Sequence, residues 1–280
     1  MGIEAAKKAI KNASINPEEI DIIIWVGTQH KDYLMWLASV NIAEKISAKN
    51  ALTFDMSALC GSVVVGIEIA KSLLCANKKY NTALLVSGSR DIDFVNLHNK
   101  DTFFMLDIGA GGSAMIIRKN WSKNIILESA FKCDGSFANE CLLKYGGSKN
   151  WPIKPKELDK LYFTIHNAKK FKDKLKKASI KNFNYVINQA MENSCLCKQD
   201  IDYIAMLHIH KSSHENLLKG LGLNDKNTTY LDHYGHLGQN DQILSIELGL
   251  QNTKIRDNSN VVLVAAGIGF IWAAVVIRWG

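Results

Sequence analysis

The second half of this 280-residue chain repeats the order of patterns found in the first half. The segment from Ala9 to Asp21 aligns without a gap with the segment from Ala190 to Asp202, and in both a helical pattern leads to a strand-like one. Two later apolar segments, 83–88 and 114–118, match 261–267 and 274–278 in the same order. We therefore predict an internal duplication, with one half over residues 1–155 and the other over 156–280. An active site is expected between them, where strand ends converge.

Helical and strand-like patterns alternate along the chain. Helices are predicted over 3–13, 36–46 and 62–75, and strands over 20–26, 52–56, 82–87 and 112–118. Alternation of this kind is typical of an α/β fold. The longest apolar run, residues 261–277, is just under the length of about 20 residues that a bilayer needs. Because Gly267 and Gly269 divide it into two β-branched runs, we predict two buried strands joined by a tight turn and no membrane span.

The composition narrows the class of protein. Apolar residues make up 47% and charged residues 22% of the chain, which excludes disordered, collagen-like and disulfide-scaffold proteins. The net charge of +7 comes almost entirely from lysine. Nucleic-acid-binding proteins favour arginine and basic stripes with interleaved aromatic residues, which are absent here, so no nucleic acid partner is expected. An acidic partner or substrate remains open.

The cysteines and the N-terminus indicate a reducing compartment. The six cysteines are scattered, and none lies in a CxxC pair or near a histidine at zinc-finger spacing, so we expect no metal. The first thirteen residues form an amphipathic helical pattern and not a signal peptide. A cytoplasmic location is predicted.

Cys60 is the strongest candidate for a nucleophile. It follows the predicted strand 52–56, neighbours Gly61 in a turn and precedes the long helix 62–75. Amides at the start of a helix favour a thiolate, and a strand–turn–helix arrangement presents the side chain to a ligand. A small buried core residue is the alternative for any lone cysteine, and we keep that interpretation for the other five.

Histidines are concentrated in the second half of the chain. His208 lies at the carboxyl end of a predicted apolar strand, and His210 follows two residues later. His236 lies in a glycine-flanked loop, YGHLG, where the backbone can approach a ligand. Zinc ligation by this group is open, although no acidic residue lies at a metal-ligand spacing. His214 and His233 are interpreted as ordinary surface residues.

Three segments resemble the β-ketoacyl-acyl carrier protein synthase III family and its thiolase-fold relatives. Residues 55–61, DMSALCG, resemble the family's nucleophile segment, and residues 104–114, FMLDIGAGGSA, are similar to its FGDGAGA stretch. Residues 265–272, AAGIGFIW, resemble its terminal GxGxxW signature. The segments occur in family order over nearly the whole chain. We therefore expect a thiolase-like, duplicated αβαβα layered fold.

The resemblance implies an acyltransferase of fatty acid or polyketide-type biosynthesis. Cys60 would take an acyl group from an acyl-CoA, and decarboxylative Claisen condensation with a malonyl thioester would follow. His208 matches the family's catalytic histidine, with His210 as the alternative, and His236 replaces the family's usual asparagine. Two imidazoles can supply the donors that an enolate needs when carbon dioxide departs.

The same resemblance implies further contacts and partners. The backbone amides of Cys60 and Ile268 would form the oxyanion hole, and Gly267 and Gly269 would contact substrate. A homodimer is expected, with no tightly bound cofactor. The lysine-rich segment 169–181 is predicted to be helical, and a solvated helix face is its ordinary interpretation. A basic helix near this point docks the acidic carrier protein in the resembling enzymes. The expected docking residues are Lys169, Lys170, Lys174 and Lys177.

Two departures from the family leave alternatives open. The chain begins at helix 3–13, whereas family members carry an opening strand and loop that contact the coenzyme A nucleotide, and His236 stands in place of asparagine. A non-decarboxylative acyl transferase on the same fold is one alternative. A non-catalytic partner subunit is the other, and the presence of Cys60, His208 and the 267–269 turn argues against it.

Overall fold

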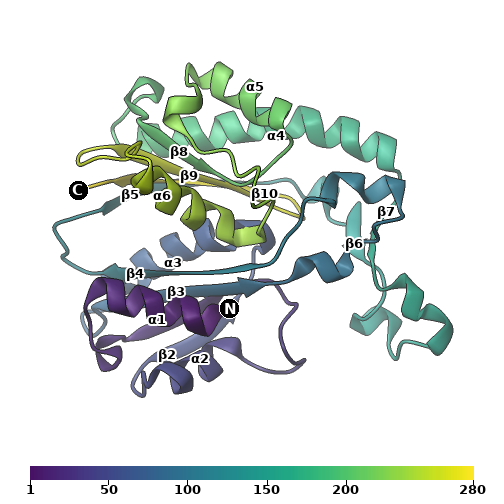
Figure 1. Cartoon of the computed structure of the whole chain (residues 1–280), viewed down its shortest axis with the longest axis horizontal. Helices are drawn as coiled ribbons and strands as arrows, with labels where there is room; N and C mark the ends of the chain where they lie inside the picture. The colour runs from purple at the N-terminus through teal and green to yellow at the C-terminus, as the bar shows by residue number, and fades with distance from the viewer.

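The strands gather into two four-stranded sheets in the computed structural model, which describes residues 1–280 (Figure 1). The strand order of the first sheet is β2 (Leu52–Met56), β1 (Ile22–Val26), β3 (Thr82–Ser89) and β4 (Gly111–Arg118). The strand order of the second sheet is β5 (Ile125–Cys133), β10 (Ile271–Arg278), β9 (Asn260–Gly267) and β8 (Tyr203–Met206). Strand β1 runs parallel to β2 and β3, and β8 runs parallel to β9. Strands β4 and β10 are antiparallel to their neighbours.

Helices form three layers around the two sheets (Figure 1). Helices α1 (Gly2–Ala13) and α2 (Ala38–Ile46) cover the outer face of the first sheet, and α4 (Ala168–Asn193) and α5 (Lys211–Leu221) cover the outer face of the second. Helices α3 (Ser62–Ala76) and α6 (Asp241–Gln251) lie between the sheets. Successive residues of a strand point to opposite faces. Ile22 and Ile24 therefore pack on this central layer, whereas Ile23 packs outward. This arrangement confirms the predicted layered α/β fold.

The apolar run near the C-terminus forms buried strands, as predicted. Strands β9 and β10 pair antiparallel along their full length, from Ile271 opposite Gly267 to Arg278 opposite Asn260. One helical stretch, Leu59–Ala76, is long and apolar enough by composition to cross a membrane. In the fold its helix α3 lies between the sheets, with Val64, Ile67 and Ala70 fully buried.

The two sheets divide earlier in the chain than residue 155. Strand β5 lies within the range predicted for the first half, yet it hydrogen-bonds to β10 in the second sheet. The sheets therefore separate between Arg118 and Ile125. A small hairpin of β6 (Cys141–Leu143) and β7 (Phe163–Ile165) lies beside them. The division into two repeated halves at residue 155 stays a prediction.

Helix α2 begins two residues later than predicted because Asp55 caps it. The Asp55 carboxylate accepts hydrogen bonds from the backbone N–H groups of Ala38 and Ser39, both at 3.0 Å, and from Lys31 Nζ at 2.7 Å. Burial raises the pKa of Asp55, but the hydrogen bond from Lys31 and those from Ser39 and Ala38 outweigh it, so the pKa is lowered. The residue at the start of the nucleophile segment thus ties β2 to α2.

Candidate active site

Cys60 lies in a one-turn 3-10 helix, Leu59–Gly61, that joins β2 to α3. Ser62 fixes this turn, because its Oγ accepts a hydrogen bond from Ala58 N (2.8 Å) and donates one to Leu59 O (2.7 Å). Cys60 is partly exposed and its thiol is free. The turn places the sulfur at the N-terminal end of a long buried helix, where the helix dipole favours negative charge.

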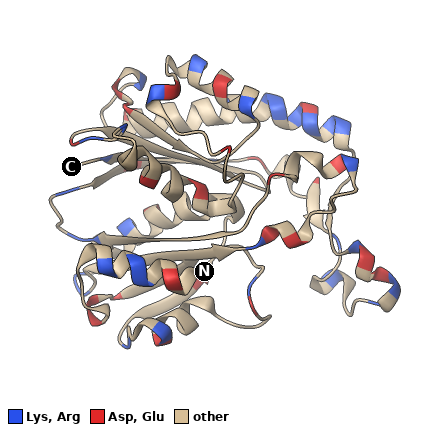
Figure 2. Ribbon diagram, in the orientation of Figure 1, with Lys and Arg blue, Asp and Glu red and all other residues tan.

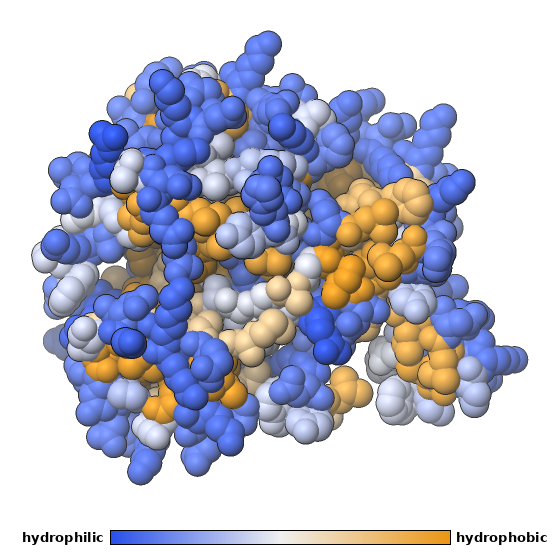
Figure 3. Space-filling model, viewed as in Figure 1, coloured by the Kyte–Doolittle hydropathy of each residue, from blue (hydrophilic) through white to orange (hydrophobic).

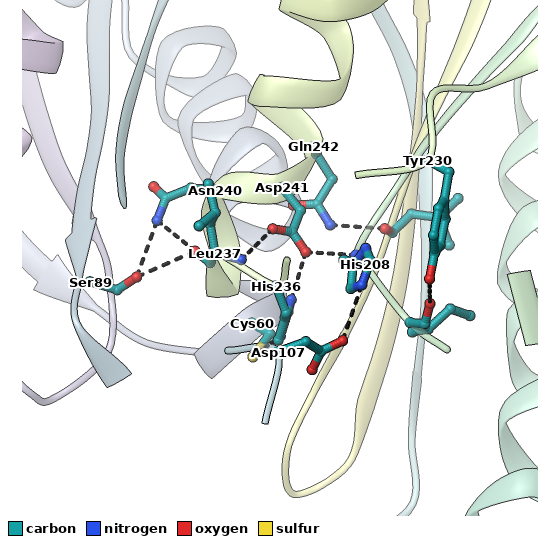
Figure 4. Close-up of polar contacts among 12 residues, drawn as sticks. Cys60, Ser89, Asp107, His208, Tyr230, His236, Leu237, Asn240, Asp241 and Gln242 are labelled. Carbon is teal, nitrogen blue, oxygen red and sulfur yellow. Dashed lines mark hydrogen bonds and ion pairs between the residues drawn. The ribbon is translucent and has the colours of Figure 1, made fainter. Parts of the chain in front are cut away.

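The loop that carries His236 is attached to the segment before β4. His236 N donates to Asp107 O (2.8 Å), and Gly109 N donates to His236 O (2.9 Å). Gly235 has a φ of +69°, and a Cβ there would lie 2.2 Å from Asp107 O, so only glycine fits. This attachment directs the His236 ring toward Cys60, with Nε2 3.2 Å from Cys60 Sγ (Figure 4).

Asp241, the first residue of α6, holds the other side of the His236 ring. Its side chain is fully buried, and Oδ2 lies 2.6 Å from His236 Nδ1. The same carboxylate accepts the backbone N–H of His208 (2.6 Å) and that of Leu237 (2.7 Å). Figure 4 shows this carboxylate between the two histidines. Burial lowers the pKa of His236, but the charges of Asp241 and Cys60 outweigh it, so this pKa lies well above 6.5.

His208 lies at the end of β8 and pairs with a different carboxylate. Its Nε2 is 3.0 Å from Asp107 Oδ2, and its buried Nδ1 has no hydrogen-bond partner. The ring packs against Tyr230 at 4.8 Å between centroids. Burial raises the pKa of Asp107, but the hydrogen bond and charge of His208 outweigh it, so this pKa is lowered. The structure thus brings His208, His236 and Cys60 into one cluster.

The other predicted histidines lie elsewhere. His210 is exposed at the start of α5, where its Nδ1 lies 3.0 Å from Ser212 Oγ, so it does not join the cluster. His214 is buried and not on the surface as predicted, because its side of α5 packs against Tyr230. His233 is exposed, as expected. No group of three His, Cys, Asp or Glu side chains is arranged to hold a metal ion.

A row of buried polar residues at the start of α6 joins the two sheets behind the cluster. Asn240 Oδ1 accepts a hydrogen bond from Ser113 Oγ of β4 (2.7 Å), and its Nδ2 donates to Leu237 O (2.8 Å). Gln242 Nε2 donates to Val264 O of β9 (2.9 Å). Sequence reasoning missed this row and Asp241. The signal available was the polar segment QNDQ at residues 239–242, which is followed by an apolar helical pattern. Its aspartate lies five residues after His236.

The glycine turn between β9 and β10 lies against the turn that carries Cys60. A Cβ on Gly267 would lie 2.0 Å from Ala58 O, so only glycine allows the two backbones this close. Gly269 has a φ of +145° and open space beside its Cα. Cys141 is also buried nearby, and burial together with the charge of Cys60 raises its pKa to about 12. Of these two cysteines, only Cys60 is hydrogen-bonded to a histidine.

The predicted lysines extend along the outer side of α4 (Figure 2). Lys169, Lys170 and Lys177 are exposed. Lys174 is held instead by Ser136 O at 2.7 Å, and its Nζ lies 4.1 Å from the Phe137 ring centroid. Hydrophobic surface lies near the N-terminal end of this helix, on the face seen in Figure 3. Phe104 lies against this helix, with its ring centroid 5.9 Å from that of Phe171, and the side chains of Phe103, Phe104 and Leu106 are exposed.

Known proteins resemble the chain over both sheets. The family model for the C-terminal part of 3-oxoacyl-[acyl-carrier-protein] synthase III matches residues 191–279, and the model named for the synthase itself matches residues 54–135. Together they match more than half of the chain. The β-ketoacyl-[acyl-carrier-protein] synthase III of Clostridium acetobutylicum is 29% identical over 280 residues, covering 100% of this chain and 83% of the relative. That of Clostridium botulinum is 29% identical over 284 residues, with 100% and 83% covered.

Solved structures share the fold. The 3-oxoacyl-[acyl-carrier-protein] synthase III of Aquifex aeolicus superposes with a TM-score of 0.86 at 18% identity, covering 100% of this chain and 83% of that one. The priming β-ketosynthase of the R1128 polyketide pathway superposes with a TM-score of 0.83 at 18% identity, covering 99% and 80%. With its layered sheets and these matches, the chain belongs to the 3-oxoacyl-[acyl-carrier-protein] synthase III family of condensing enzymes.

Proposed function

We propose that this chain transfers an acyl group from an acyl-CoA to Cys60 and then condenses it with a malonyl thioester, as a β-ketoacyl-acyl carrier protein synthase III does. The observation that carries the proposal is the contact of 3.2 Å between Cys60 Sγ and His236 Nε2 at the start of α3. A thiol within hydrogen-bond reach of an oriented imidazole is the arrangement that nucleophilic catalysis needs.

The first half-reaction loads the acyl group. The Cys60 thiolate attacks the thioester carbonyl, the S–C bond to Cys60 forms, and the bond to coenzyme A sulfur breaks. The departing thiolate takes the proton from His236 Nε2 and leaves as free coenzyme A. We assign the oxyanion hole to the backbone amides of Cys60 and Ile268. The close approach of the Gly267 turn to the Cys60 turn supports this assignment.

The second half-reaction forms the carbon–carbon bond. Loss of carbon dioxide from the malonyl thioester leaves an enolate, which attacks the acyl carbon and releases Cys60 as a thiolate. His208 is assigned as the donor to the enolate oxygen: its Nε2–H stays on the ring and exchanges its hydrogen bond to Asp107 for one to that oxygen. Asp107 is half-exposed, so an incoming thioester can replace it. A proton from solvent then restores His236 for the next cycle.

The contact of Asp107 with His208 also favours a second candidate function, acyl transfer without decarboxylation. The Asp107 carboxylate already occupies the His208 N–H that an enolate would require. If substrate does not displace it, Cys60 would still accept an acyl group and pass it to another nucleophile. The two candidates differ only after Cys60 has been acylated.

We assign the docking of an acidic carrier protein to the outer side of α4. Lys169, Lys170 and Lys177 are exposed, and the apolar side chains of Phe103 and Phe104 lie near the same end of the molecule. Clustered positive charge steers an acidic partner and raises its association rate. A homodimer and a cytoplasmic location complete the proposal.

The test is intact-mass spectrometry of the purified protein after incubation with a panel of acyl-CoAs. We expect a gain of one acyl group, absent from Cys60→Ala. Malonyl thioester is then added: discharge of the adduct with release of carbon dioxide supports condensation, whereas an adduct discharged only by another acceptor supports the second candidate. A folded protein that takes no acyl group from any donor would overturn both.

A further inference from the structure

We infer that Asp241 is a positioning residue that links Cys60, His236 and Asp241 into a catalytic triad, in which His236 takes the thiol proton on Nε2. This inference deepens the proposed function and rests on Cys60 being its nucleophile. It assigns a role to a residue five positions after His236, at the first turn of a helix that carries no substrate contact in the proposed reaction.

The surroundings of Asp241 fix the proton positions. Three groups lie within 2.7 Å of its oxygens, namely the backbone N–H of His208, the backbone N–H of Leu237 and His236 Nδ1. The two backbone groups can only donate, so both carboxylate oxygens act as acceptors. Donation by a histidine Nδ1–H satisfies the third contact. The carboxylate is also at the N-terminus of α6, where negative charge is favourable.

Once Nδ1 carries a proton, Nε2 is the ring nitrogen that can accept the proton of the Cys60 thiol. In neutral His236, Nε2 then has a free electron pair directed at Cys60 Sγ, 3.2 Å away. The thiol proton moves from Sγ to Nε2, which leaves a thiolate and an imidazolium whose second proton stays on Nδ1. No atom is gained or lost, and the imidazolium beside Asp241 is the acid that later protonates the departing coenzyme A thiolate.

His208, the second imidazole of the cluster, lacks the contacts by which His236 can take the thiol proton. Its side chain makes no hydrogen bond to Cys60, its Nδ1 has no partner, and its carboxylate, Asp107, is 45% exposed against 0% for Asp241. The acidic groups that face His236 are Asp241, Asp107 and Asp91, together with the Cys60 thiol. Among them only Asp241 and Cys60 hydrogen-bond to its ring.

The test measures the rate of Cys60 alkylation by iodoacetamide against pH, which needs no acyl donor. At neutral and mildly acidic pH, Asp241→Asn should lose about tenfold or more of the wild-type rate, and at high pH it should approach the wild type. Glu247→Gln removes a partly exposed carboxylate of the same helix, which pairs with Lys8, and should leave the profile unchanged. An Asp241→Asn profile that matches the wild type would overturn the inference.

A double variant tests whether Asp241 acts through His236, and NMR of the wild type covers the case in which Asp241→Asn folds poorly. In a His236→Ala background, adding Asp241→Asn should not change the alkylation profile further, because Asp241 acts through His236. Nitrogen-15 NMR of histidine-labelled wild type should show protons on both His236 ring nitrogens near neutral pH, with Nδ1–H shifted downfield. A neutral His236 ring with its proton on Nε2 would contradict the triad. If the alkylation profiles are as expected but Cys60 is not acylated by any donor, the proposed function is refuted and the triad is still supported.

Discussion

The two histidines beside Cys60 should separate the two half-reactions, because only His236 contacts the sulfur. His236→Ala removes the group that takes the thiol proton, and acylation at neutral pH should slow by about 100-fold or more. His208→Ala keeps the backbone N–H that Asp241 accepts, so acylation should persist while release of carbon dioxide from malonyl thioester falls by a similar factor. Intact mass reports the first step and carbon dioxide release the second. Equal loss of both steps in both variants would contradict this division of roles.

His214 should make the protein less stable at acidic pH. The residue is 4% exposed, and neither ring nitrogen has a hydrogen-bond partner. Burial lowers its pKa to about 4, with a further lowering by the charge of His208 and a smaller opposing effect of Asp225. Between about pH 6.5 and 4 the unfolded chain therefore binds a proton that the folded chain does not, so stability falls as the pH falls.

The full loss from this single group is about 3 kcal/mol below pH 4. Urea unfolding at a series of pH values should show His214→Phe losing stability less steeply than the wild type across that window. His233→Phe, at an exposed histidine, serves as the control and should follow the wild type. Parallel curves for His214→Phe and the wild type would show that the ring does not stay neutral in the fold.

Residue types and sequence neighbours predicted part of the candidate active site, and long-range contacts determine the rest. Cys60 and His208 carry local signals, since each follows a strand, and His236 has glycines beside it. Asp241 has only the polar segment around it as a signal, and that segment does not predict burial, because an aspartate at the start of a helix ordinarily lies in solvent. Its burial depends on His208, 33 positions away, and His214 was misplaced because Tyr230, which covers it, comes from another segment.

Helix α4 should bind its carrier protein through charge. Reversing Lys169, Lys170 and Lys177 to Glu should weaken binding of an acidic carrier protein by about tenfold or more at low salt, and the difference should shrink as salt is raised. Isothermal titration or surface plasmon resonance measures it. Lys174 is left intact because it contacts Ser136 O and the Phe137 ring. Reversing Lys11, Lys45 and Lys49, exposed near α1 and α2, changes the net charge equally and should have little effect. Equal weakening by both triple variants would exclude a specific docking face.

Patterns local to one element located the strands and helices, but not the sheet to which each strand belongs. Alternation and apolar runs predicted β1, β3, β9 and β10 because burial on both faces leaves little but apolar residues in them. Strand β5 mixes exposed and buried positions, and only its pairing with β10 assigns it to the second sheet. The sheet to which β5 belongs is a property of the whole molecule, since its partner β10 lies more than a hundred residues away.

The central layer should make the whole molecule unfold as one unit. Ile67 of α3 is fully buried in a core that contains Ile24 of the first sheet and Leu263 of the second. Ile67→Ala should therefore lower the free energy of unfolding by about 2–5 kcal/mol, as measured in urea, because it opens a cavity between both sheets.

Hydrogen exchange then shows whether the two sheets share that stability. Ile187 of α4 packs only on the outer face of the second sheet. Because α3 and α6 couple the sheets, Ile187→Ala should reduce protection of the slowest-exchanging amides in β1 as much as in β9. Ile42 of α2 packs on the outer face of the first sheet. Ile42→Ala should likewise reduce the protection of the slowest-exchanging amides in β9 as much as in β1. Loss of protection confined to the sheet that carries the substitution would show that the two sheets unfold independently, and that the shared layer does not couple them.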